Sequence, residues 1–234
     1  MPKKIVSIIP NLITLCNLLS GCIAIFLAFH LGEEFGSLPG LYWAWIAIGA
    51  AAVFDFCDGA SARLLNAYSD LGKELDSLSD LVSFGVAPAM MILNIMACNA
   101  ASPLWAACSL LIPALGAYRL AKFNIDDSQT TSFKGLPIPA NAIFWIGLAD
   151  WIHRYGYPST GLMIALIVIV AGLMVTNVPM FSLKFHNFKI KENVLRFILI
   201  LSAIVLIVLQ GVSGLMWTVV LYIIISLLSK PLSK

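Results

Sequence analysis

Residues 55 to 80, DFCDGASARLLNAYSDLGKELDSLSD, hold half of the twelve acidic residues of the chain. Asp55 and Asp58 are three residues apart and Asp76 and Asp80 are four apart, so each pair shares a face if its segment is helical. Four carboxylates that converge repel one another and take up protons unless a strong positive charge lies among them. A divalent cation meets that need, and oxygen ligands without nearby His or Cys favour Mg²⁺ or Mn²⁺.

The stretch between the two acidic pairs is poor in side-chain bulk. Gly59 and Ala62 leave little volume on the first segment, and Gly72 does the same on the second, so a ligand can approach the backbone. Arg63 offers a planar fork of donors that suits a phosphate. The alternative interpretation, a helix end followed by a solvated loop, leaves Asp55 without a partner.

The elements that carry these residues belong to a membrane. Hydrophobic residues make up 60% of the chain, charged residues 11%, and the mean hydropathy is +0.94, which excludes a water-soluble domain. Apolar runs of about 20 residues, the length that crosses a bilayer core, recur along the chain. We predict a single all-α domain over residues 1–234, a polytopic helical bundle with spans near 11–31, 41–65, 78–98, 103–123, 138–153, 159–178, 193–209 and 212–229.

The distribution of basic residues predicts the orientation. With the N-terminus in the cytoplasm, every Lys and Arg except Arg154 falls on the cytoplasmic side, as the positive-inside rule requires. Asp55 and Asp58 then lie near the cytoplasmic end of the second span. A carboxylate there is costly unless it is paired, so it faces the bundle interior and indicates function. Asp150 is expected at the outer interface, paired with Arg154 at helical spacing.

A cation transporter also buries carboxylates in membrane helices and is the alternative from another class. It is disfavoured because the acids cluster at one end of the spans and because no inverted repeat or interrupted helix pair is evident. A net charge of +2 gives no reason to expect a nucleic-acid partner.

The motif resembles the D-x-x-D-G-x-x-A-R-x8-G-x-x-x-D-x-x-x-D signature of the CDP-alcohol phosphotransferases. The resemblance implies a six-helix core, here with about two additional C-terminal spans, a homodimer, and transfer of a phosphoalcohol unit from a CDP-linked donor with release of CMP. It also implies that Asp80 completes the metal site and is the catalytic base. The remaining roles that it implies are metal binding by Asp55, Asp58 and Asp76, and donor binding by Gly59, Ala62, Arg63 and Gly72.

Other stretches narrow the resemblance. IPNLITLCNLLSG at 9–21, RLAKFN at 119–124, FKGLPIPAN at 133–141 and LMVTNVPMFSLKF at 173–185 resemble the phosphatidylserine synthase branch of the family. In that branch the donor is CDP-diacylglycerol and the acceptor is L-serine. Glycerol 3-phosphate or inositol phosphate is the alternative acceptor. The resemblance implies an integral membrane enzyme, expected in a bacterial inner membrane with its site facing the cytoplasm.

Two further groups of residues have both a functional and a structural interpretation. Polar residues on one face of the first helix either contact the nucleotide phosphates or make helix–helix hydrogen bonds; they are Asn11, Thr14 and Asn17. Residues after the fourth span and in the FKGLPIPAN stretch either hold the acceptor or a phosphate, or belong to a rigid loop; they are Arg119, Lys122, Asn124 and Lys134.

Overall fold

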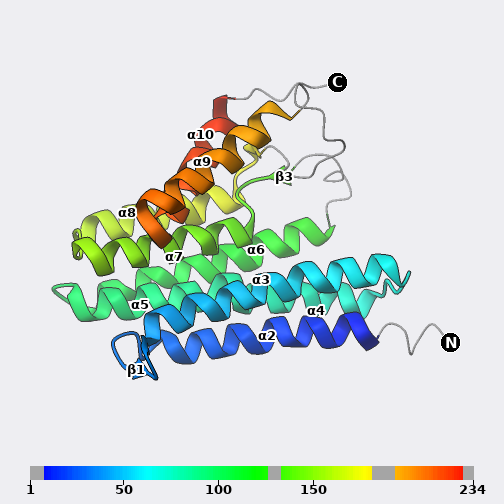
Figure 1. Ribbon diagram of the computed structural model, residues 1–234, viewed down its shortest axis with the longest axis horizontal. Coiled ribbons are helices and arrows are strands. Elements are labelled where there is room, and N and C mark those ends of the chain that lie inside the picture. The colour runs from blue at the N-terminus through cyan, green and yellow to red at the C-terminus, as the bar shows by residue number, and fades with distance from the viewer. Residues whose placement is uncertain (1–7, 126–132, 181–192, 229–234) are drawn as a thin grey trace.

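The computed structural model describes residues 8–125, 133–180 and 193–228, and within them it is a bundle of helices (Figure 1). Each of the eight predicted spans coincides with a helical segment, so the predicted all-α architecture is confirmed. The helices are α2 (Ile8–Ala28), α3 (Gly40–Leu64), α4 (Asp70–Asp80), α5 (Ala87–Asn99), α6 (Leu111–Ile125), α7 (Ile138–Tyr155), α8 (Thr160–Val175), α9 (Val194–Gln210) and α10 (Gly214–Leu228).

Five helical segments of the described chain are long and apolar enough to cross a membrane. They are Ile8–Ala28, Gly40–Leu64, Asp70–Asn99, Pro103–Ile125 and Val194–Leu228. The last is not one straight helix, because Gly211 adopts a positive φ of 62° and α9 and α10 pack against each other. Backbone groups in a bilayer must be paired within the segment, which a helix achieves. The chain is therefore an integral membrane protein.

The third helical segment begins earlier than predicted. Hydropathy indicated a start near residue 78, whereas α4 begins at Asp70, because the Ser69 hydroxyl caps the helix by accepting a hydrogen bond from the Gly72 N–H at 3.0 Å. α4 continues through a π-helical turn, η1 (Leu81–Val86), into α5. The second half of the acidic motif is thus helical and is no solvated loop.

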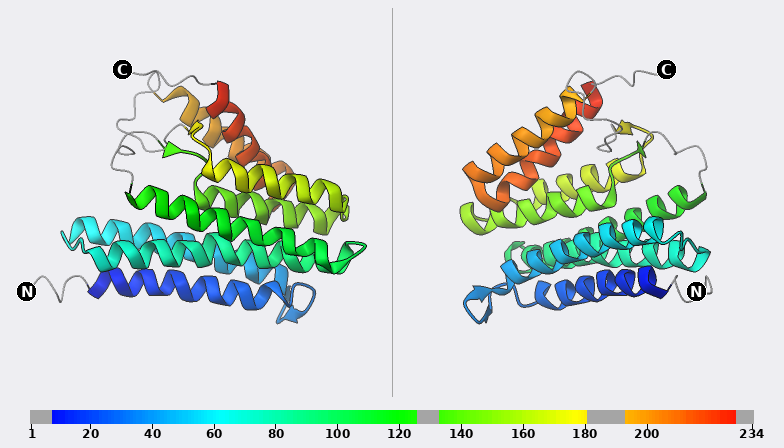
Figure 2. Two further views of the ribbon diagram at one scale, coloured as in Figure 1. Left: turned by 180° about the vertical axis from the view of Figure 1, so that it is seen from behind. Right: turned by 45° about the vertical axis from the view of Figure 1, so that its right-hand side comes forward.

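The helices run back and forth along the long axis of the molecule (Figures 1 and 2). α2, α3 and the α4–α5 segment form one side of the bundle, and the α9–α10 hairpin lies obliquely across α7 on the other. A short 3₁₀ segment, η2 (Pro103–Leu110), leads into α6. Two-stranded pairs complete the description: β1 (Glu34–Phe35) with β2 (Leu38–Pro39), and β3 (Phe133–Lys134) with β4 (Pro179–Met180).

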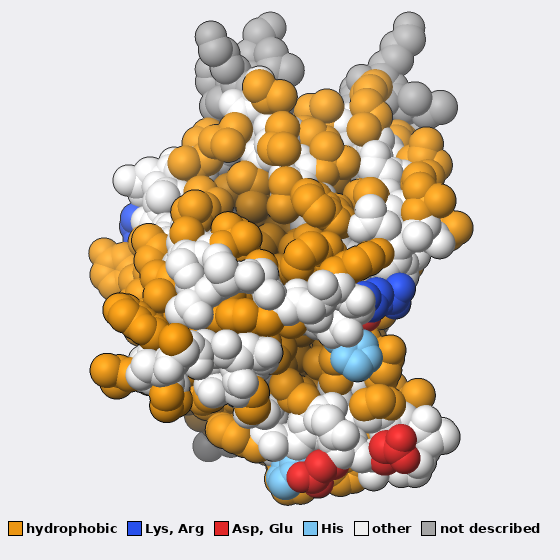
Figure 3. Space-filling view, turned by 90° about the vertical axis from the view of Figure 1, so that its left-hand side faces the viewer, with side chains coloured by type: hydrophobic (Ala, Val, Ile, Leu, Met, Phe, Trp, Pro, Cys, Tyr) orange, Lys and Arg blue, Asp and Glu red, His pale blue; other side chains and the backbone are white. Residues whose placement is uncertain are grey.

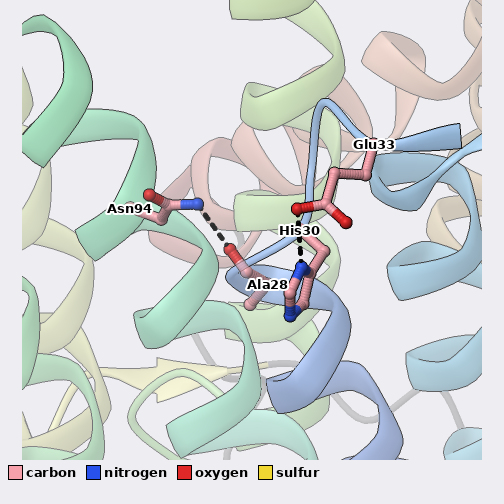
Figure 4. A network of polar contacts seen from close by, with 4 residues as sticks. All are labelled: Ala28, His30, Glu33 and Asn94. Carbon is pink, nitrogen blue, oxygen red and sulfur yellow. Dashed lines mark hydrogen bonds and ion pairs between the residues drawn. The ribbon is translucent and has the colours of Figure 1, made fainter.

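The end of the bundle that carries β1 is almost free of basic residues. Figure 3 views this end and shows a surface dominated by hydrophobic side chains, with few charged ones. Here the Asn94 side chain donates to the Ala28 carbonyl at 2.8 Å and ties α5 to the end of α2, while His30 Nδ1 lies 2.8 Å from Glu33 Oε1 (Figure 4). The opposite end carries every described Lys and Arg except Arg154.

The contacts of Asp150 extend beyond its predicted pair with Arg154. It pairs with Arg154 as predicted, with Asp150 Oδ2 2.9 Å from Arg154 Nε, but its side chain is completely buried. The same carboxylate oxygen accepts hydrogen bonds from the Ser213 N–H at 2.7 Å and the Ser213 hydroxyl at 2.5 Å. Asp150 is buried because it joins α7 to the turn of the C-terminal hairpin, a contact that helical spacing alone does not reveal.

Candidate active site

The acidic motif folds into two helices that meet at a tight turn. α3 ends at Leu64 and α4 begins at Asp70, and between them Asn66 takes a positive φ of 49°. Asn tolerates this left-handed conformation better than most residues. The turn reverses the chain, so that the end of α3 and the start of α4 border one cavity and Asp55 meets Asp76 and Asp80.

Three of the four aspartates form a compact cluster. Asp55, Asp76 and Asp80 each offer a carboxylate oxygen, and these three oxygens lie within 4.8 Å of one another. Asp58 lies outside this cluster and is 5% exposed, and its Oδ2 makes no hydrogen bond within the described residues. Clustered carboxylates and a buried, unsatisfied carboxylate oxygen are both costly without a cation. The oxygen-only donor set fits a hard divalent ion such as Mg²⁺ or Mn²⁺.

A cavity of about 1040 Å³ opens beside this cluster. Its volume is at the upper end of the range for small-molecule sites. Most residues predicted for the metal and the donor line it, namely Asn11, Thr14, Asp55, Asp58, Gly59, Ala62, Arg63, Gly72 and Asp76. Asp80 belongs to the carboxylate cluster but does not line this cavity.

The two glycines of the motif have different surroundings. A Cβ atom at Gly59 would meet nothing within 4 Å, so this position faces open space in the cavity wall. A Cβ at Gly72 would lie 3.0 Å from Asn11 Oδ1 and from Ser69 Oγ. Gly72 therefore allows α2 and the cap of α4 to approach closely, in addition to lining the cavity.

The polar face of α2 contributes in two ways. Asn17 donates a long hydrogen bond of 3.4 Å to Asp80 Oδ1, and Asn17 itself is fully buried. The Thr14 hydroxyl donates to the Pro10 carbonyl at 3.0 Å, inside its own helix. Asn17 thus makes the expected helix–helix contact, whereas Asn11 and Thr14 border the cavity.

The basic residues at this end of the bundle differ in exposure and line two different cavities. Arg63 and Lys73 are exposed and line the large cavity. Arg119 is buried, and with Lys122 and Lys134 it lines a second cavity of about 10 Å³, room for about one water molecule. Three of the four residues predicted for the acceptor therefore lie together.

Asn124, the fourth of these residues, has a structural contact. Its side chain donates to Ser77 Oγ at 2.9 Å, and its carbonyl accepts from Lys73 Nζ at 3.0 Å. Both contacts attach the end of α6 to α4. Lys122 also has a partner, since its ammonium donates to Asn177 Oδ1 at 2.8 Å.

The FKGLPIPAN stretch is fixed by backbone hydrogen bonds, and one of its residues lines the large cavity. Gly135 has φ of 77°, and the N–H groups of Gly135 and Leu136 donate to the Val178 and Leu173 carbonyls at 2.9 and 3.0 Å. A Cβ at Gly135 would clash with the Met174 carbonyl, so glycine is required. Pro137, which follows, lines the large cavity.

Sequence reasoning missed several residues that line the large cavity. Pro10, Tyr68, Lys73, Pro137 and Tyr222 were not predicted to do so. Tyr68, in the turn before α4, and Lys73, on α4, lie inside the motif stretch, which is the signal that could have suggested them. No sequence signal indicated Tyr222, which comes from the last helix.

The fold and the site together define a class of protein. It is a polytopic helical membrane protein with a cluster of aspartates beside a large cavity. A model of the CDP-alcohol phosphatidyltransferase family matches residues 7–183, so the chain belongs to that family. The match contains the whole acidic motif and ends before α9.

Individual relatives extend the similarity further along the chain. The chain is 33% identical over 230 residues to a CDP-diacylglycerol–serine O-phosphatidyltransferase of Helicobacter pylori, covering 96% of this chain and 91% of the relative. A protein of the same name from Methanocaldococcus jannaschii is 35% identical over 172 residues, 74% and 72% of the two chains. One from Bacillus subtilis is 40% identical over 132 residues, 56% of this chain and 69% of the relative.

Proposed function

We propose that the chain transfers the phosphatidyl group of CDP-diacylglycerol to the hydroxyl of L-serine, forming phosphatidylserine and CMP. The observation that carries the proposal is the carboxylate cluster of Asp55, Asp76 and Asp80 beside a cavity large enough for a nucleotide-linked lipid headgroup. Family membership supplies the CDP-linked donor, and the names of the relatives supply CDP-diacylglycerol and serine.

The carboxylate cluster is the proposed metal site. Asp55, Asp58, Asp76 and Asp80 would hold Mg²⁺ or Mn²⁺, which when bound neutralises charge on the donor diphosphate and on the departing CMP. Gly59, Ala62 and Gly72 leave space beside the helices for the donor, and Arg63 and Lys73 supply positive charge to its phosphates at the cavity wall. Asn11 and Thr14 add neutral polar groups on the α2 side.

Asp80 is the proposed general base. The serine oxygen forms a bond to the phosphatidyl phosphorus while the bond from that phosphorus to CMP breaks, and Asp80 accepts the proton of the serine hydroxyl. Asn17 donates to Asp80 Oδ1 and so orients the carboxylate. Arg119, Lys122 and Lys134 bring positive charge to the same end of the bundle, where the carboxylate of serine must be held.

The location of the site follows from the charge distribution. The end that carries the motif also carries almost all described basic residues, and basic ends of membrane helices stay in the cytoplasm. We place the site at the cytoplasmic face of a bacterial inner membrane. The protein acts as a homodimer in this proposal, which native mass measurement in detergent tests.

The experiment that tests the reaction is an acceptor panel. Purified protein is given CDP-diacylglycerol with Mg²⁺ or Mn²⁺ and one of L-serine, glycerol 3-phosphate or inositol phosphate, and CMP release is measured. L-Serine is expected to be the acceptor that supports turnover. Turnover with glycerol 3-phosphate or inositol phosphate instead would support the phosphatidyl transfer but contradict L-serine as the acceptor.

Removal of metal is the first specific prediction. Excess EDTA is expected to abolish CMP release, because the carboxylate cluster and the donor diphosphate then repel each other. Added Mg²⁺ or Mn²⁺ beyond the chelator should restore the rate. Full turnover in EDTA would contradict the metal site.

A further inference from the structure

The start of α7 packs against the π-helical turn η1, which follows Asp80 directly. The side-chain amide of Asn141 donates to the Phe84 carbonyl of this turn at 3.2 Å. Three residues earlier on the same face of α7, Ile138 lies against the turn, since a Cβ at Gly85 would be 3.6 Å from Ile138 Cδ1. Asn141 and Ile138 are both fully buried. The FKGLPIPAN stretch therefore supports the turn with one polar and one apolar side chain.

Pro88 explains why the turn needs a hydrogen-bond donor from another helix. In an α-helix the Phe84 carbonyl would accept from the N–H of residue 88. Proline has no N–H, and its ring collides with the carbonyl four residues earlier. The helix is π-helical here, and the Ala87 N–H donates to the Val82 carbonyl, five residues before it. A carbonyl that loses its partner inside a membrane is costly, so the amide of Asn141 takes the place of the missing N–H.

The orientation of Asn141 is itself fixed. One helical turn further along α7, the indole N–H of the fully buried Trp145 donates to Asn141 Oδ1 at 2.8 Å. Because an indole nitrogen can only donate, the amide oxygen must face Trp145, and the amide nitrogen then faces Phe84. The Asn141 backbone N–H donates to the Pro137 carbonyl at 3.0 Å, within the first turn of the helix. Asn141 is therefore a donor held in one direction.

The turn that Asn141 contacts is continuous with the helix that carries Asp80. Phe84 lies four residues after Asp80, about one helical turn further along the segment. The residue before it, Ser83, donates to the Asn17 carbonyl at 3.0 Å, and the Asn17 amide donates to Asp80 Oδ1 at 3.4 Å. Neighbouring residues of the turn are thus bonded to two different helices, α2 and α7. Together these contacts set where Asp80 lies.

We propose that Asn141 is a positioning residue for the reaction: it supplies the hydrogen bond that Pro88 cannot, and so holds the π-helical turn with Asp80 in the carboxylate cluster. The inference rests on the proposed function, in which Asp80 is the base, and deepens it. Asn141 does not line the large cavity and touches no substrate, so it acts through Asp80. The FKGLPIPAN stretch thereby gains a role in catalysis besides that of a rigid loop.

The test replaces Asn141 by leucine, which has a similar size and makes no hydrogen bond. The full chain in detergent is given Mg²⁺ and saturating CDP-diacylglycerol and L-serine, and CMP release is measured. Asn141→Leu is expected to lower kcat about 10- to 100-fold, the effect of a small displacement of a catalytic group. Its affinity for CDP-diacylglycerol, from titration calorimetry, should stay within about twofold, because Asn141 is no part of the cavity wall.

The decisive measurement is the same replacement in an Asp80→Asn background, at high enzyme concentration. If Asn141 acts through Asp80, Asn141→Leu should lower kcat by no more than about twofold there, because the base that it positions is already absent. A merely structural role would give the same loss in both backgrounds.

Asn94→Leu is the matched control. The Asn94 amide also donates to a backbone carbonyl of a neighbouring helix, that of Ala28 at 2.8 Å, but at the opposite end of the bundle (Figure 4). This variant should lower the thermal unfolding temperature and leave kcat unchanged. An equal loss of kcat in Asn94→Leu and Asn141→Leu would overturn the inference. Asn141→Ala carries the same comparisons if Asn141→Leu does not fold.

The outcomes separate this inference from the proposed function. An unchanged kcat in Asn141→Leu overturns the inference alone, and so do equal losses with and without Asp80. An Asp80→Asn variant with wild-type kcat overturns the base and the inference with it. Wild-type protein that releases no CMP with L-serine, glycerol 3-phosphate or inositol phosphate overturns the proposed function as well.

Discussion

At the scale of single residues, the four aspartates of the motif are not equivalent. Asp55 and Asp76 belong to the carboxylate cluster and line the large cavity, whereas Asp58 lines the cavity outside the cluster. Asp80 is in the cluster, does not line the cavity, and accepts a hydrogen bond from Asn17. Because Asp80 does not line the cavity that the donor would occupy, it is the aspartate of the cluster least suited to bind the donor directly.

Replacement of Asp80 tests that division of roles. Asp80→Asn is expected to lower kcat by about 100- to 10,000-fold, the usual contribution of a general base. CDP-diacylglycerol binding should remain, because the amide oxygen can still accept from Asn17 and because two carboxylates of the cluster stay in place. The measurements are kcat from CMP release and donor affinity from titration calorimetry.

Asp55→Asn is the matched comparison for this prediction. It removes a carboxylate that both belongs to the cluster and lines the cavity, so turnover and donor affinity should fall together. If Asp80→Asn loses affinity for CDP-diacylglycerol as severely as Asp55→Asn does, Asp80 is chiefly a metal ligand and the prediction that it is the base is wrong.

At the scale of elements, the π-helical turn after Asp80 is the least regular part of the site. Such turns are rare and occur frequently at functional sites. The turn packs against α2, where its Ser83 hydroxyl donates to the Asn17 carbonyl at 3.0 Å. One helical turn earlier, the Ser79 hydroxyl of α4 donates to the Thr14 carbonyl at 3.2 Å. These contacts hold α2 and its polar face against the helix that carries Asp80.

Gly21 is the position on α2 that permits this packing. A Cβ there would lie 2.8 Å from Ser83 Cα, so Gly21→Ala must push α2 away from the π-helical turn. We expect a loss of about 1–3 kcal/mol in stability, as for other overpacked sites, together with reduced turnover. The measurement is thermal unfolding in detergent.

Gly49→Ala is the control for Gly21→Ala. Gly49 lies inside α3, and a Cβ there meets nothing within 4 Å. This replacement should be neutral or stabilising, because alanine favours a helix over glycine by about 1 kcal/mol. Equal unfolding temperatures for the two variants would show that the close packing of α2 against η1 does not contribute to stability.

At the scale of the whole molecule, charge is strongly polarised along the bundle. Described Lys and Arg residues gather at the end that holds the motif, and the opposite end has Arg154, neutralised by Asp150. The site therefore shares its side of the membrane with the basic residues, which is the cytoplasmic side by the positive-inside rule.

Labelling with an impermeant thiol reagent tests this orientation. In a background without the other native cysteines, Glu74→Cys places a thiol on the exposed face of α4, and it should react only after the cells are opened. Glu74 is preferred to Ser69, whose hydroxyl caps α4. Native Cys98 alone, exposed near the end of α5, is the matched control and should react in intact cells. The reverse pattern would invert the topology.

The sequence by itself determined the membrane class, the approximate positions of the helical segments and the acidic motif. These properties are local: hydropathy over about 20 residues identifies a span, and spacings of three and four place Asp55 with Asp58 and Asp76 with Asp80 on helix faces. The start of α4 at Asp70 was missed, because a polar, capped helix end has no hydropathy signal.

Only the tertiary structure decided which of these groups meet. Asp80 lies beside Asn17, Asp150 is buried against Ser213, and Tyr222 reaches the cavity from the last helix. Each contact joins residues far apart in the chain, and no periodicity within one helix encodes which neighbour its face will pack against. The register between helices is set by close approaches such as Gly21 with Ser83 and Gly147 with Met216, and it exists only once the bundle has formed.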